Sequence, residues 1–410
     1  GAAFAAPDGL ATEQIAGLAD RLDAATLVVQ GPPGSGKTYT AAHVAAELLA
    51  RGRRIGVTAH SHRAIHLLLR EIERVVAERG ERFEGYVLVR EGEGEGYESA
   101  HGFISGGNAK LAEMPQAALV AGTAWAFAPE AMSEQLDVLL IDEAGQLALA
   151  DAVAVGGAAR NLILFGDPQQ LPHVARATHV AGAGVSALEH LLGDDRTIPP
   201  ERGVFLAATH RLEPGICRFV STLMYDGRLH PAAGRAHAAL IGEDPIWSGR
   251  GLRAIAVVHE DCSRESREEA DAIGAAVERL LHTELERAGL RRPLEQRDIM
   301  VVAPYNRQVG AIRSALDARG FHAVEAGTVD LFQGREAEVA LFSLTSSSAE
   351  DLPRGIAFAF SPNRLNVAVS RARTLAVLVY SPRLLALRSE TVDDIRLVNA
   401  VALFAEQAAS

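Results

Sequence analysis

The stretch LVVQGPPGSGKTYT, residues 27–40, constrains the fold of this chain more than any other part of it. Its apolar start is typical of a buried strand, and the segment KTYTAAHVAAELLA has the pattern of a helix. The loop between them fits G-x-x-x-x-G-K-[ST] at every fixed position from Gly31 to Thr38. A strand, such a loop and a helix in direct succession predict a phosphate-binding loop at the end of a parallel strand, and therefore nucleotide binding.

The residues of this loop suit a phosphate ligand. Its glycines let backbone N–H groups turn inward around phosphate oxygens, and the following helix adds the positive end of its dipole. Lys37 is expected to reach the β- and γ-phosphates of the nucleotide, and Thr38 to offer its hydroxyl to Mg²⁺. The residues expected to hold the nucleotide here are Gly31, Pro32, Pro33, Gly34, Ser35, Gly36, Lys37, Thr38 and Tyr39.

Short apolar runs alternate with helical periodicity along the whole chain of 410 residues. This rhythm is typical of parallel sheets with helices on both faces. The length exceeds what a single core usually holds, so we expect two α/β domains in tandem. The Gly-, Asp- and Pro-rich stretch 191–203 is the natural division, and we place the boundary near residue 195, giving domains 1–195 and 196–410.

One segment breaks this rhythm. Residues 90–110 are glycine-rich, acidic and without period, within a wider stretch 81–116. This composition predicts a flexible loop or a small insertion. It could be a solvated loop or a flap over a substrate.

Composition restricts the class of protein. No window approaches the roughly eighteen apolar residues of a membrane span, and no basic-then-apolar leader opens the chain. Cys217 and Cys262 have neither the spacing of a metal site nor the number needed for a disulfide framework. These features favour a cytoplasmic enzyme without a membrane partner. The net charge of −12 argues against a globally basic nucleic-acid binder but allows a basic groove on one face.

Two further loops are expected beside the phosphate loop. Asp142 and Glu143 follow the apolar run in LDVLLIDEAGQ, at the edge where open α/β sheets bind ligands. Adjacent carboxylates are costly there without a cation, so Asp142 is expected to hold Mg²⁺ together with Thr38. Glu143 is expected to orient and deprotonate the attacking water. Gln170, in LILFGDPQQLPHV, has an amide that can donate to a γ-phosphate oxygen and accept from water.

In this order GPPGSGKT, DEAGQ and GDPQQLP resemble motifs I, II and III of superfamily 1 helicases. The likeness continues in HRLEPGICRFVSTLMYDGRL and in VVAPYNRQ, GTVDLFQGREAEVALFSL and LNVAVSRARTLAVLV, which resemble motifs IV, V and VI. The set is most similar to superfamily 1B, the branch with the nonsense-mediated decay RNA helicase, senataxin and the immunoglobulin mu-binding helicase. The resemblance runs from about residue 10 to residue 382. It implies two tandem RecA-like P-loop domains with an ATP site in the cleft between them.

The resemblance also implies contacts to the adenosine. Gln14, in LATEQ, matches the glutamine that hydrogen-bonds the adenine, and Tyr305 is similar to the aromatic residue that stacks on it. Glu336, in QGRE, matches the glutamate that contacts the ribose. Gln333 occupies the same seam between the domains.

Arg211 and Arg371 match two arginines that the family aims at the γ-phosphate from the second domain. A loose phosphoryl-transfer transition state gains from extra positive charge, which a guanidinium on a separate domain supplies only when the cleft closes. ATP binding would then close the domains and hydrolysis would release them. Arg371 and Arg373 could instead be surface ion-pairing residues. The catalytic set implied is Lys37, Asp142, Glu143, Gln170, Arg211 and Arg371.

Contacts to nucleic acid are expected from two loops of the first domain. VTAHSHRAIHLLL resembles motif Ia, where Ser61 would donate to a backbone phosphate, and AGTAWAF resembles motif Ic, where Thr123 would do the same. Such contacts position a strand without reading its sequence. Phe127 or Trp125 could stack on a base, although aromatic residues just past a strand are more often core.

Several strand-side positions depart from the family pattern. Ala11, His62 and Ser266 stand where asparagine is usual, and Ser346 stands where an arginine commonly follows motif V. The family's β-barrel accessory domain, expected before the Q motif, is not in this sequence, which starts at Gly1 without a methionine, as a processed or truncated chain would.

Two functions therefore stay open. The first is a monomeric ATP- and Mg²⁺-dependent helicase or translocase that moves 5′ to 3′ on single-stranded DNA or RNA, with DNA slightly favoured by the Ala-, Gly- and Arg-rich composition. The second is an ATP-switched nucleic-acid-binding module of a larger protein, for example one fused to or associated with a nuclease. A P-loop kinase acting on a small molecule would leave the motifs of the second half without a role.

Overall fold

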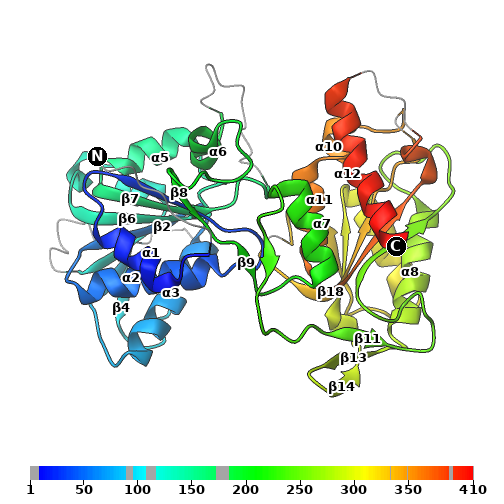
Figure 1. The fold of residues 1–410 in the computed structure, drawn as a ribbon, viewed down its shortest axis with the longest axis horizontal. Helices are drawn as coiled ribbons and strands as arrows, with labels where there is room; N and C mark the ends of the chain where they lie inside the picture. Colours follow the sequence, from blue (N-terminus) through cyan, green and yellow to red (C-terminus); the bar gives the residue numbers. More distant parts are fainter. Residues whose placement is uncertain are drawn as a thin grey trace. The chain divides into compact units, whose positions relative to one another are not determined.

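The computed structural model describes residues 9–88, 96–107, 117–171, 184–332, 334–348, 350–386 and 391–409. The chain forms two compact units, Gly1–Ala207 and Ala208–Ser410, and Figure 1 labels many of their helices and strands. The division lies after Ala207 rather than near residue 195, where the sequence placed it. The reason is that β8 (Gly203–Phe205) pairs with β1 (Thr26–Gln30) and so completes the first sheet.

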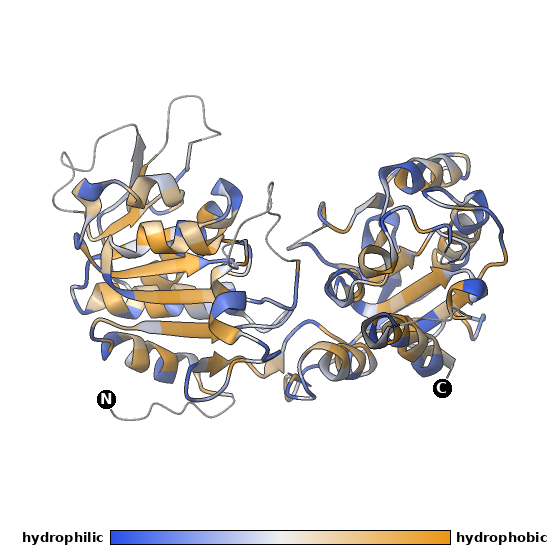
Figure 2. Ribbon diagram, turned by 90° about the horizontal axis from the view of Figure 1, so that it is seen from above, coloured by the Kyte–Doolittle hydropathy of each residue, from blue (hydrophilic) through white to orange (hydrophobic). Residues whose placement is uncertain are grey.

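The first unit is built on an eight-stranded sheet in the order β4-β3-β5-β2-β6-β7-β1-β8. Every pairing in it is parallel, as the sequence predicted for this α/β class. Its strands are predominantly hydrophobic (Figure 2), as expected when helices cover both faces. The remaining strands are β2 (Ile55–Ala59), β3 (Gly85–Leu88), β4 (Ile104–Gly107), β5 (Leu119–Ala121), β6 (Leu136–Asp142) and β7 (Ala159–Gly166).

Helices cover the two faces of this sheet. Figure 1 shows α1, α2 and α3 on one face and α5 and α6 on the other. Helix α2, which follows the phosphate loop, packs between α1 and α3 and contributes buried alanines and Val44 to the core. The helices are α1 (Thr12–Asp20), α2 (Lys37–Ala50), α3 (His62–Glu78), α4 (Ala124–Phe127), α5 (Leu149–Gly156) and α6 (Ala187–Leu192), with a 3-10 turn at Glu130–Met132.

The expected insertion between residues 81 and 116 is, in its described part, a fixed extension of the sheet. Strands β3 and β4 pair in parallel, and the chain between them docks on α3 through the buried Glu73. The Glu73 carboxylate accepts hydrogen bonds from the Tyr97 hydroxyl at 2.7 Å, from the Ala100 N–H at 3.2 Å and from the Ser99 hydroxyl. Residues 89–95 and 108–116 of this stretch lie outside the described residues.

The second unit has a five-stranded parallel sheet in the order β12-β18-β17-β15-β16. A small antiparallel sheet, β11-β13-β14, and a two-residue parallel pair, β9 with β10, accompany it. The strands are β9 (Ala208–Thr209), β10 (His230–Pro231), β11 (Ala239–Ile241), β12 (Gly251–Ala256), β13 (Glu284–Arg287), β14 (Leu290–Pro293), β15 (Ile299–Ala303), β16 (Glu325–Thr328), β17 (Ala337–Ser343) and β18 (Ala372–Tyr380).

The core of this unit again lies between strands and helices. Buried residues of α8 and α9 pack on the central strands in one cluster, while the rings of Phe219 on α7 and Phe404 on α12 meet edge to face at 5.2 Å. None of the described helices of either unit is both long and apolar enough to cross a bilayer. The helices are α7 (Pro214–Met224), α8 (Arg267–Leu280), α9 (Asn306–Asp317), α10 (Ile356–Ala359), α11 (Pro362–Val369) and α12 (Val392–Ala409), with 3-10 turns at Gln296–Asp298 and Pro382–Leu384.

A buried polar network holds the chain just after β17. The fully buried Glu269 carboxylate accepts from the Ser343 hydroxyl at 2.5 Å and from the Thr345 N–H at 2.9 Å. The other oxygen of Glu269 lies 3.1 Å from Nε2 of His259, whose Nδ1 is 2.7 Å from the Ser347 hydroxyl. Thr345 has φ of +73°, a left-handed conformation that is strained for a β-branched residue. The network thus fixes a strained loop at the carboxyl edge of the second sheet.

Candidate functional site

Three loops of the first unit meet at the carboxyl edge of its sheet. Strand β7 lies between β1 and β6 and pairs with both, so the loops that follow these strands are neighbours. The N–H of Gly31 donates to the carbonyl of Gly166 at 2.9 Å, and the N–H of Ala144 donates to that of Phe165 at 2.9 Å. The fold therefore joins the glycine-rich loop, the Asp-Glu pair and the GDPQQ loop into one site, although they are far apart in sequence.

The glycine-rich loop is closed around its own lysine. Lys37 Nζ donates to the carbonyl of Gly31 at 2.6 Å. A Cβ at Gly31 would collide with the Lys37 side chain and with the Ser35 hydroxyl, and Gly36 adopts a left-handed φ of +82° at the start of α2. The Ser35 Oγ is buried and has no hydrogen-bond partner among the described residues. A buried hydroxyl without a partner, in a glycine-rich loop directly before a helix, fits phosphate oxygens.

Asp142 is the last residue of β6 and is almost completely buried. Its Oδ1 accepts from the N–H of Glu143 at 2.9 Å. Burial, and next the charge of Glu143, raise the pKa of Asp142 to about 7, against the opposing effects of that hydrogen bond and of Lys37. A carboxyl group in such surroundings gains strongly from a nearby cation, because the cation stabilises its ionised form.

This shift predicts the pH dependence of stability in the absence of Mg²⁺ and nucleotide. Between about pH 4 and pH 7 the unfolded aspartate, with an ordinary pKa of 3.8, is ionised while the buried one keeps its proton. The folded state binds more protons in this window, so its stability falls as the pH rises. The side chain of the Asp142→Asn variant stays neutral at every pH. We therefore expect the melting temperature of the wild type to fall relative to that of this variant between about pH 4 and pH 7, and the difference to stay constant above this window. Thermal melts of both proteins in the presence of a chelator test this. A difference between their melting temperatures that stays constant from pH 4 to pH 8 would contradict it.

Glu143 adopts a left-handed conformation, with φ of +52°. A turn holds it there, because the N–H of Gln146 donates to the Glu143 carbonyl at 2.8 Å and the Gln146 amide donates to its carboxylate at 3.3 Å. Non-glycine residues in this region of backbone space store strain that is commonly found at functional sites. The turn presents the carboxylate immediately beyond Asp142.

The GDPQQ loop is organised by the buried Asp167. Its Oδ2 accepts from the amide of Gln170 at 2.9 Å, and its Oδ1 accepts from the N–H of Gln169 at 3.1 Å. Asp167 therefore orients the Gln170 amide, a function that sequence reasoning missed. Whether Gln170 senses the γ-phosphate stays a prediction.

The residues expected to contact adenine have structural partners of their own. The Gln14 side chain accepts from the N–H of Ala11, the residue before α1, at 2.9 Å and so holds the start of this helix. The ring of Tyr305, at the start of α9, lies 5.7 Å from that of Phe358, and its hydroxyl is buried without a partner among the described residues. Gln333 lies outside the described residues. Phe358, with Arg354 and Arg364 over its ring, carried no signal in the sequence.

Glu336 lies between two arginines. Its carboxylate accepts from Arg211 Nε at 2.5 Å and from Arg373 Nη1 at 3.1 Å. Burial pushes the pKa of Glu336 upward, but the two guanidinium groups outweigh it and hold the pKa below its ordinary value. Arg211 and Glu336 were identified from separate motifs. In the structure they form one ion-paired group together with Arg373.

Arg371 is not a surface residue, so the alternative of surface ion pairing is wrong for it. The residue is only 1% exposed. Its guanidinium donates to the carbonyls of Val367 at 2.9 Å, Arg335 at 2.9 Å and Phe332 at 3.3 Å. In this structure Arg371 ties α11 to the loop before β17, and its expected role at the γ-phosphate stays a prediction.

The two candidate strand contacts lie on neighbouring loops of the first sheet. Strands β2 and β5 are adjacent, and Ser61 and Thr123 follow them. The Ser61 Oγ accepts from the N–H of Ala64 at 3.3 Å, which leaves its own proton to donate, and Thr123 makes no side-chain cap bond to α4. Of the two aromatic residues nearby, Phe127 is core at 1% exposure, whereas Trp125 is 68% exposed.

Two departures from the family pattern have a structural explanation. Ser266 caps α8 by accepting from the N–H of Glu269 at 3.1 Å, which an asparagine would also do. Ser346 is buried and donates to the carbonyl of Ser263 at 2.7 Å. An arginine side chain at this position would not fit the same buried space.

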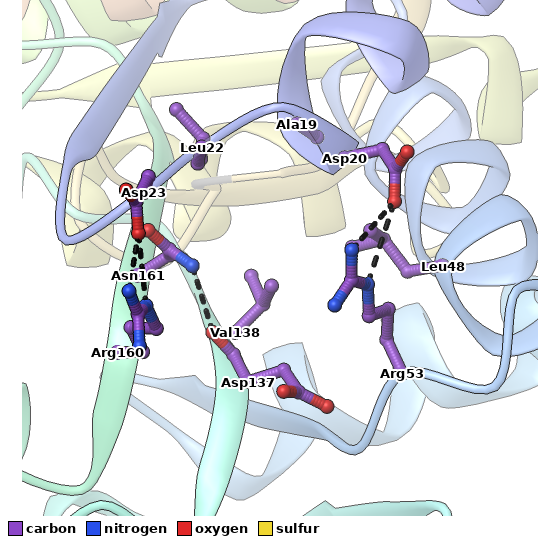
Figure 3. A pocket seen from close by; sticks show the side chains of 10 residues that line it. All are labelled: Ala19, Asp20, Leu22, Asp23, Leu48, Arg53, Asp137, Val138, Arg160 and Asn161. Atoms are coloured by element: carbon purple, nitrogen blue, oxygen red, sulfur yellow. Dashed lines mark hydrogen bonds and ion pairs between the residues drawn. The ribbon is translucent and has the colours of Figure 1, made fainter.

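A pocket of about 340 Å³ lies away from this site, at the amino ends of β6 and β7 (Figure 3). Its charged side chains are already paired, Arg53 with Asp20 at 3.4 Å and Arg160 with Asp23 at 2.5 Å. The phosphate loop is at the opposite edge of the sheet, and we assign the pocket no function. No group of three or more His, Cys, Asp or Glu side chains in the described part of the chain gathers as a metal site.

Models of an AAA domain match residues 9–189 and 183–383. The DNA replication ATP-dependent helicase/nuclease JHS1 of Arabidopsis thaliana is 29% identical over 380 residues, which cover 88% of this chain and 27% of that protein. The ATP-dependent helicase NAM7 of Saccharomyces cerevisiae is 28% identical over 408 residues, which cover 88% of this chain and 40% of that protein. An arterivirus nonstructural protein 10 (helicase) in complex with DNA has 15% identity and a TM-score of 0.47, over 87% of this chain and 61% of its own. The chain thus spans well under half the length of these two curated relatives.

Proposed function

We propose that this chain, a homologue of superfamily 1B helicases, hydrolyses ATP to move along single-stranded nucleic acid. The observation that carries the proposal is the meeting of three loops at one sheet edge, where the hydrogen bonds of Gly31 and Ala144 to the end of β7 bring Lys37, Asp142 and Gln170 together. A phosphate cradle, a pair of carboxylates and a γ-phosphate sensor are the parts that nucleotide hydrolysis requires.

The proposed chemistry is in-line hydrolysis. Backbone N–H groups of the glycine-rich loop and Lys37 bind the β- and γ-phosphates, and Gln170 helps to orient a water. Glu143 accepts the proton of this water as its oxygen bonds to the γ-phosphorus and the bond to the β–γ bridging oxygen breaks, which yields ADP and phosphate. Mg²⁺, held by Thr38 and Asp142, would neutralise charge on the β- and γ-oxygens. The raised pKa of Asp142 supports a cation beside it.

The second unit supplies the remaining groups of the proposed site. Its Tyr305 would stack on adenine and its Glu336 would contact the ribose, while Gln14 of the first unit would bond the edge of the adenine. If Glu336 turns to the ribose, Arg211 is released from its 2.5 Å ion pair and can reach the γ-phosphate. Closure of the two units around ATP, and their release after hydrolysis, would drive the movement.

Arg211 and Arg371 should respond differently to alanine. Arg211→Ala is expected to lower the hydrolysis rate by about 10³-fold, the effect of removing an arginine finger, with little change in melting temperature. Arg371→Ala leaves buried carbonyls unpaired, so we expect a lower melting temperature in addition to any loss of rate. Single-turnover hydrolysis and thermal melts of both variants separate the two effects. An unchanged melting temperature for Arg371→Ala, or an unchanged rate for Arg211→Ala, would contradict these assignments.

The proposed polymer is single-stranded, with DNA slightly favoured over RNA and movement from 5′ to 3′. Ser61 and Thr123 would bind backbone phosphates from adjacent loops, a mode that positions the strand without reading it. We further propose that the protein acts as a monomer in the cytoplasm.

A second candidate is an ATP-switched clamp within a larger protein. The buried Ser346, where an arginine is usual, favours it, because the second unit then grips a strand less firmly. One relative is named a helicase/nuclease, and this chain covers 27% of it. In that case the ATP cycle would open and close the grip without directional movement, and a fused or associated nuclease would act on the strand.

Steady-state ATP hydrolysis tests the proposal. We expect strong stimulation by single-stranded DNA or single-stranded RNA, weak stimulation by blunt duplex, and a loss of stimulation as salt is raised. The polymer that stimulates more is the substrate. Turnover that no polymer changes would overturn the motor assignment in favour of the switched clamp.

A further inference from the structure

We propose that the second unit holds an anion-binding site for a phosphate group, and that Arg235 is its principal cation. The inference rests on the proposed function and deepens it, because the site adjoins Arg211 and Glu336, which that function places at the nucleotide. The ligand is the γ-phosphate of ATP or the inorganic phosphate that hydrolysis releases. Both present a tetrahedral group of oxygens, which guanidinium groups bind by charge-assisted hydrogen bonds.

A shift in strand register gathers charged side chains at the amino ends of β17 and β18. The pairing of these strands shifts by one residue between Ala337 and Val339, which leaves an extra residue on β18. Such a shift lets two successive residues turn to one partner. The Thr374 hydroxyl donates to the carboxylate of Glu338 at 2.7 Å, and Nε of the preceding Arg373 lies 3.8 Å from the same carboxylate.

The hairpin of β13 and β14 brings another guanidinium to this carboxylate. Arg287, the last residue of β13, donates through Nη2 to both oxygens of Glu338, at 2.8 and 2.9 Å. Glu336, two residues before Glu338, is bound at one oxygen by Arg211 and at the other by Arg373. Each oxygen of the two carboxylates is therefore already a hydrogen-bond acceptor.

Arg235, between β10 and β11, lies beside these ion pairs without joining them. Its side chain is partly buried and has no hydrogen bond or ion pair with any residue that the structure describes. Burial, and next the charges of Arg373 and Arg287, hold the pKa of Arg235 below its ordinary value. The attraction of Glu336 and Glu338 does not outweigh these effects. A bound anion would stabilise the charge of Arg235, which the protein itself leaves unbalanced.

The whole group has more positive charge and more donors than it can satisfy. It contains four guanidinium groups and two carboxylates, which leaves a surplus of two positive charges. The Nε atoms of Arg287 and Arg373 are buried and have no hydrogen-bond partner within the described part of the chain. Buried donors without an acceptor are rare and call for a bound ion or water. A phosphate supplies both the missing charge and several acceptor oxygens.

The size of this surplus favours a terminal phosphate over other anions. A phosphodiester of a nucleic-acid backbone carries one negative charge, as does the carboxylate of an acidic peptide side chain. A terminal phosphate carries close to two at neutral pH. The continuity of the site with Arg211 and Glu336 also points to the phosphate of the nucleotide or of its product.

Melting temperatures test the site without hydrolysis. Lys37→Ala is the background, because it removes the cation of the glycine-rich loop, the other phosphate site. Inorganic phosphate, compared with chloride at equal ionic strength, should raise the melting temperature of Lys37→Ala by roughly 2–4 °C more than that of Lys37→Ala/Arg235→Gln. The general stabilisation by phosphate is common to both variants. In chloride the double variant should be at least as stable, because repulsion by Arg287 and Arg373 is relieved.

Two further substitutions in the same background serve as controls. Arg235→Lys keeps the charge but loses the planar fork, so it should retain part of the phosphate response. Arg267→Gln makes the same change of charge at an arginine of α8 whose side chain is 87% exposed, and it should keep the full response.

Nucleotide affinities in the otherwise wild-type chain tell the two sources of phosphate apart. If the γ-phosphate of ATP occupies the site, Arg235→Gln should weaken binding of a non-hydrolysable ATP analogue by at least roughly tenfold and leave ADP binding unchanged. If released phosphate occupies the site, both affinities should stay unchanged, and added inorganic phosphate should inhibit hydrolysis less in Arg235→Gln than in the wild type.

The outcomes distinguish this inference from the function on which it rests. A phosphate response that is equal with and without Arg235, or one that Arg267→Gln reduces as much as Arg235→Gln, would overturn the anion site and leave the proposed motor in place. A wild-type chain that hydrolyses no ATP, combined with a phosphate response that depends on Arg235, would overturn the proposed function and leave a site for inorganic phosphate.

Discussion

Lys37→Ala is expected to reduce ATP hydrolysis by at least about 10²–10³-fold, the loss found when a preorganised donor to a developing charge is removed. Lys37 is the cation of the glycine-rich loop, and its Nζ is already held there by the Gly31 carbonyl at 2.6 Å. Lys37→Arg should fail as well, because a planar guanidinium replaces a compact ammonium where even a Cβ on Gly31 would collide with the lysine side chain. Hydrolysis assays measure the loss of rate, and titration with a fluorescent ATP analogue measures any loss of nucleotide binding.

The chain provides its own control for this variant. The sequence contains only two lysines, Lys37 and Lys110. Lys110→Ala makes the same chemical change at a lysine that is not part of the glycine-rich loop motif, and it should leave hydrolysis at the wild-type rate. Wild-type turnover by Lys37→Ala would remove the phosphate loop from the mechanism.

Glu143→Gln is the second large effect that we expect. The amide keeps the size and the left-handed turn of Glu143 but cannot accept a proton, so the hydrolysis rate should fall by about 10²–10⁴-fold while ATP still binds. Single-turnover hydrolysis and equilibrium binding of the nucleotide measure rate and affinity separately. A variant that loses binding and rate together would show that Glu143 serves structure or binding rather than proton transfer.

Glu134 is a matched control for the same substitution. It too is a glutamate in the left-handed region, with φ of +54°, but it lies in the turn before β6, at the opposite edge of the sheet. Glu134→Gln should hydrolyse ATP normally. Glycine at either position relieves the backbone strain, so Glu143→Gly should be no less stable than the wild type while remaining inactive.

The pattern of apolar and polar residues along the chain predicted the parallel α/β fold, because each buried strand and the glycine-rich loop are formed by consecutive residues. The resemblance to superfamily 1B helicases was likewise confirmed by the relatives. The boundary near residue 195 was wrong because β8 is only three residues long and its membership depends on pairing with β1, which the sequence does not record.

The residues of the candidate site could be predicted where they belong to a sequence motif. Their contacts could not, because these depend on how distant segments pack. The pattern of the glycine-rich loop identified Lys37. In contrast, the burial of Arg371 and the hydrogen bond from Arg373 to Glu336 depend on contacts between distant segments. The pair Trp125 and Phe127 shows the same limit. Both are aromatic residues just past a strand, and only the rotation of α4 decides which one is core.

Directional movement is the measurement that tests the central claim most directly. Streptavidin is bound to biotin at the 3′ end or the 5′ end of a single-stranded oligonucleotide, and its displacement is followed after ATP is added, with Glu143→Gln as the inactive control. We expect faster displacement from the 3′ end, dependent on ATP hydrolysis. Stimulated hydrolysis without displacement from either end would contradict a motor and leave an ATP-switched clamp.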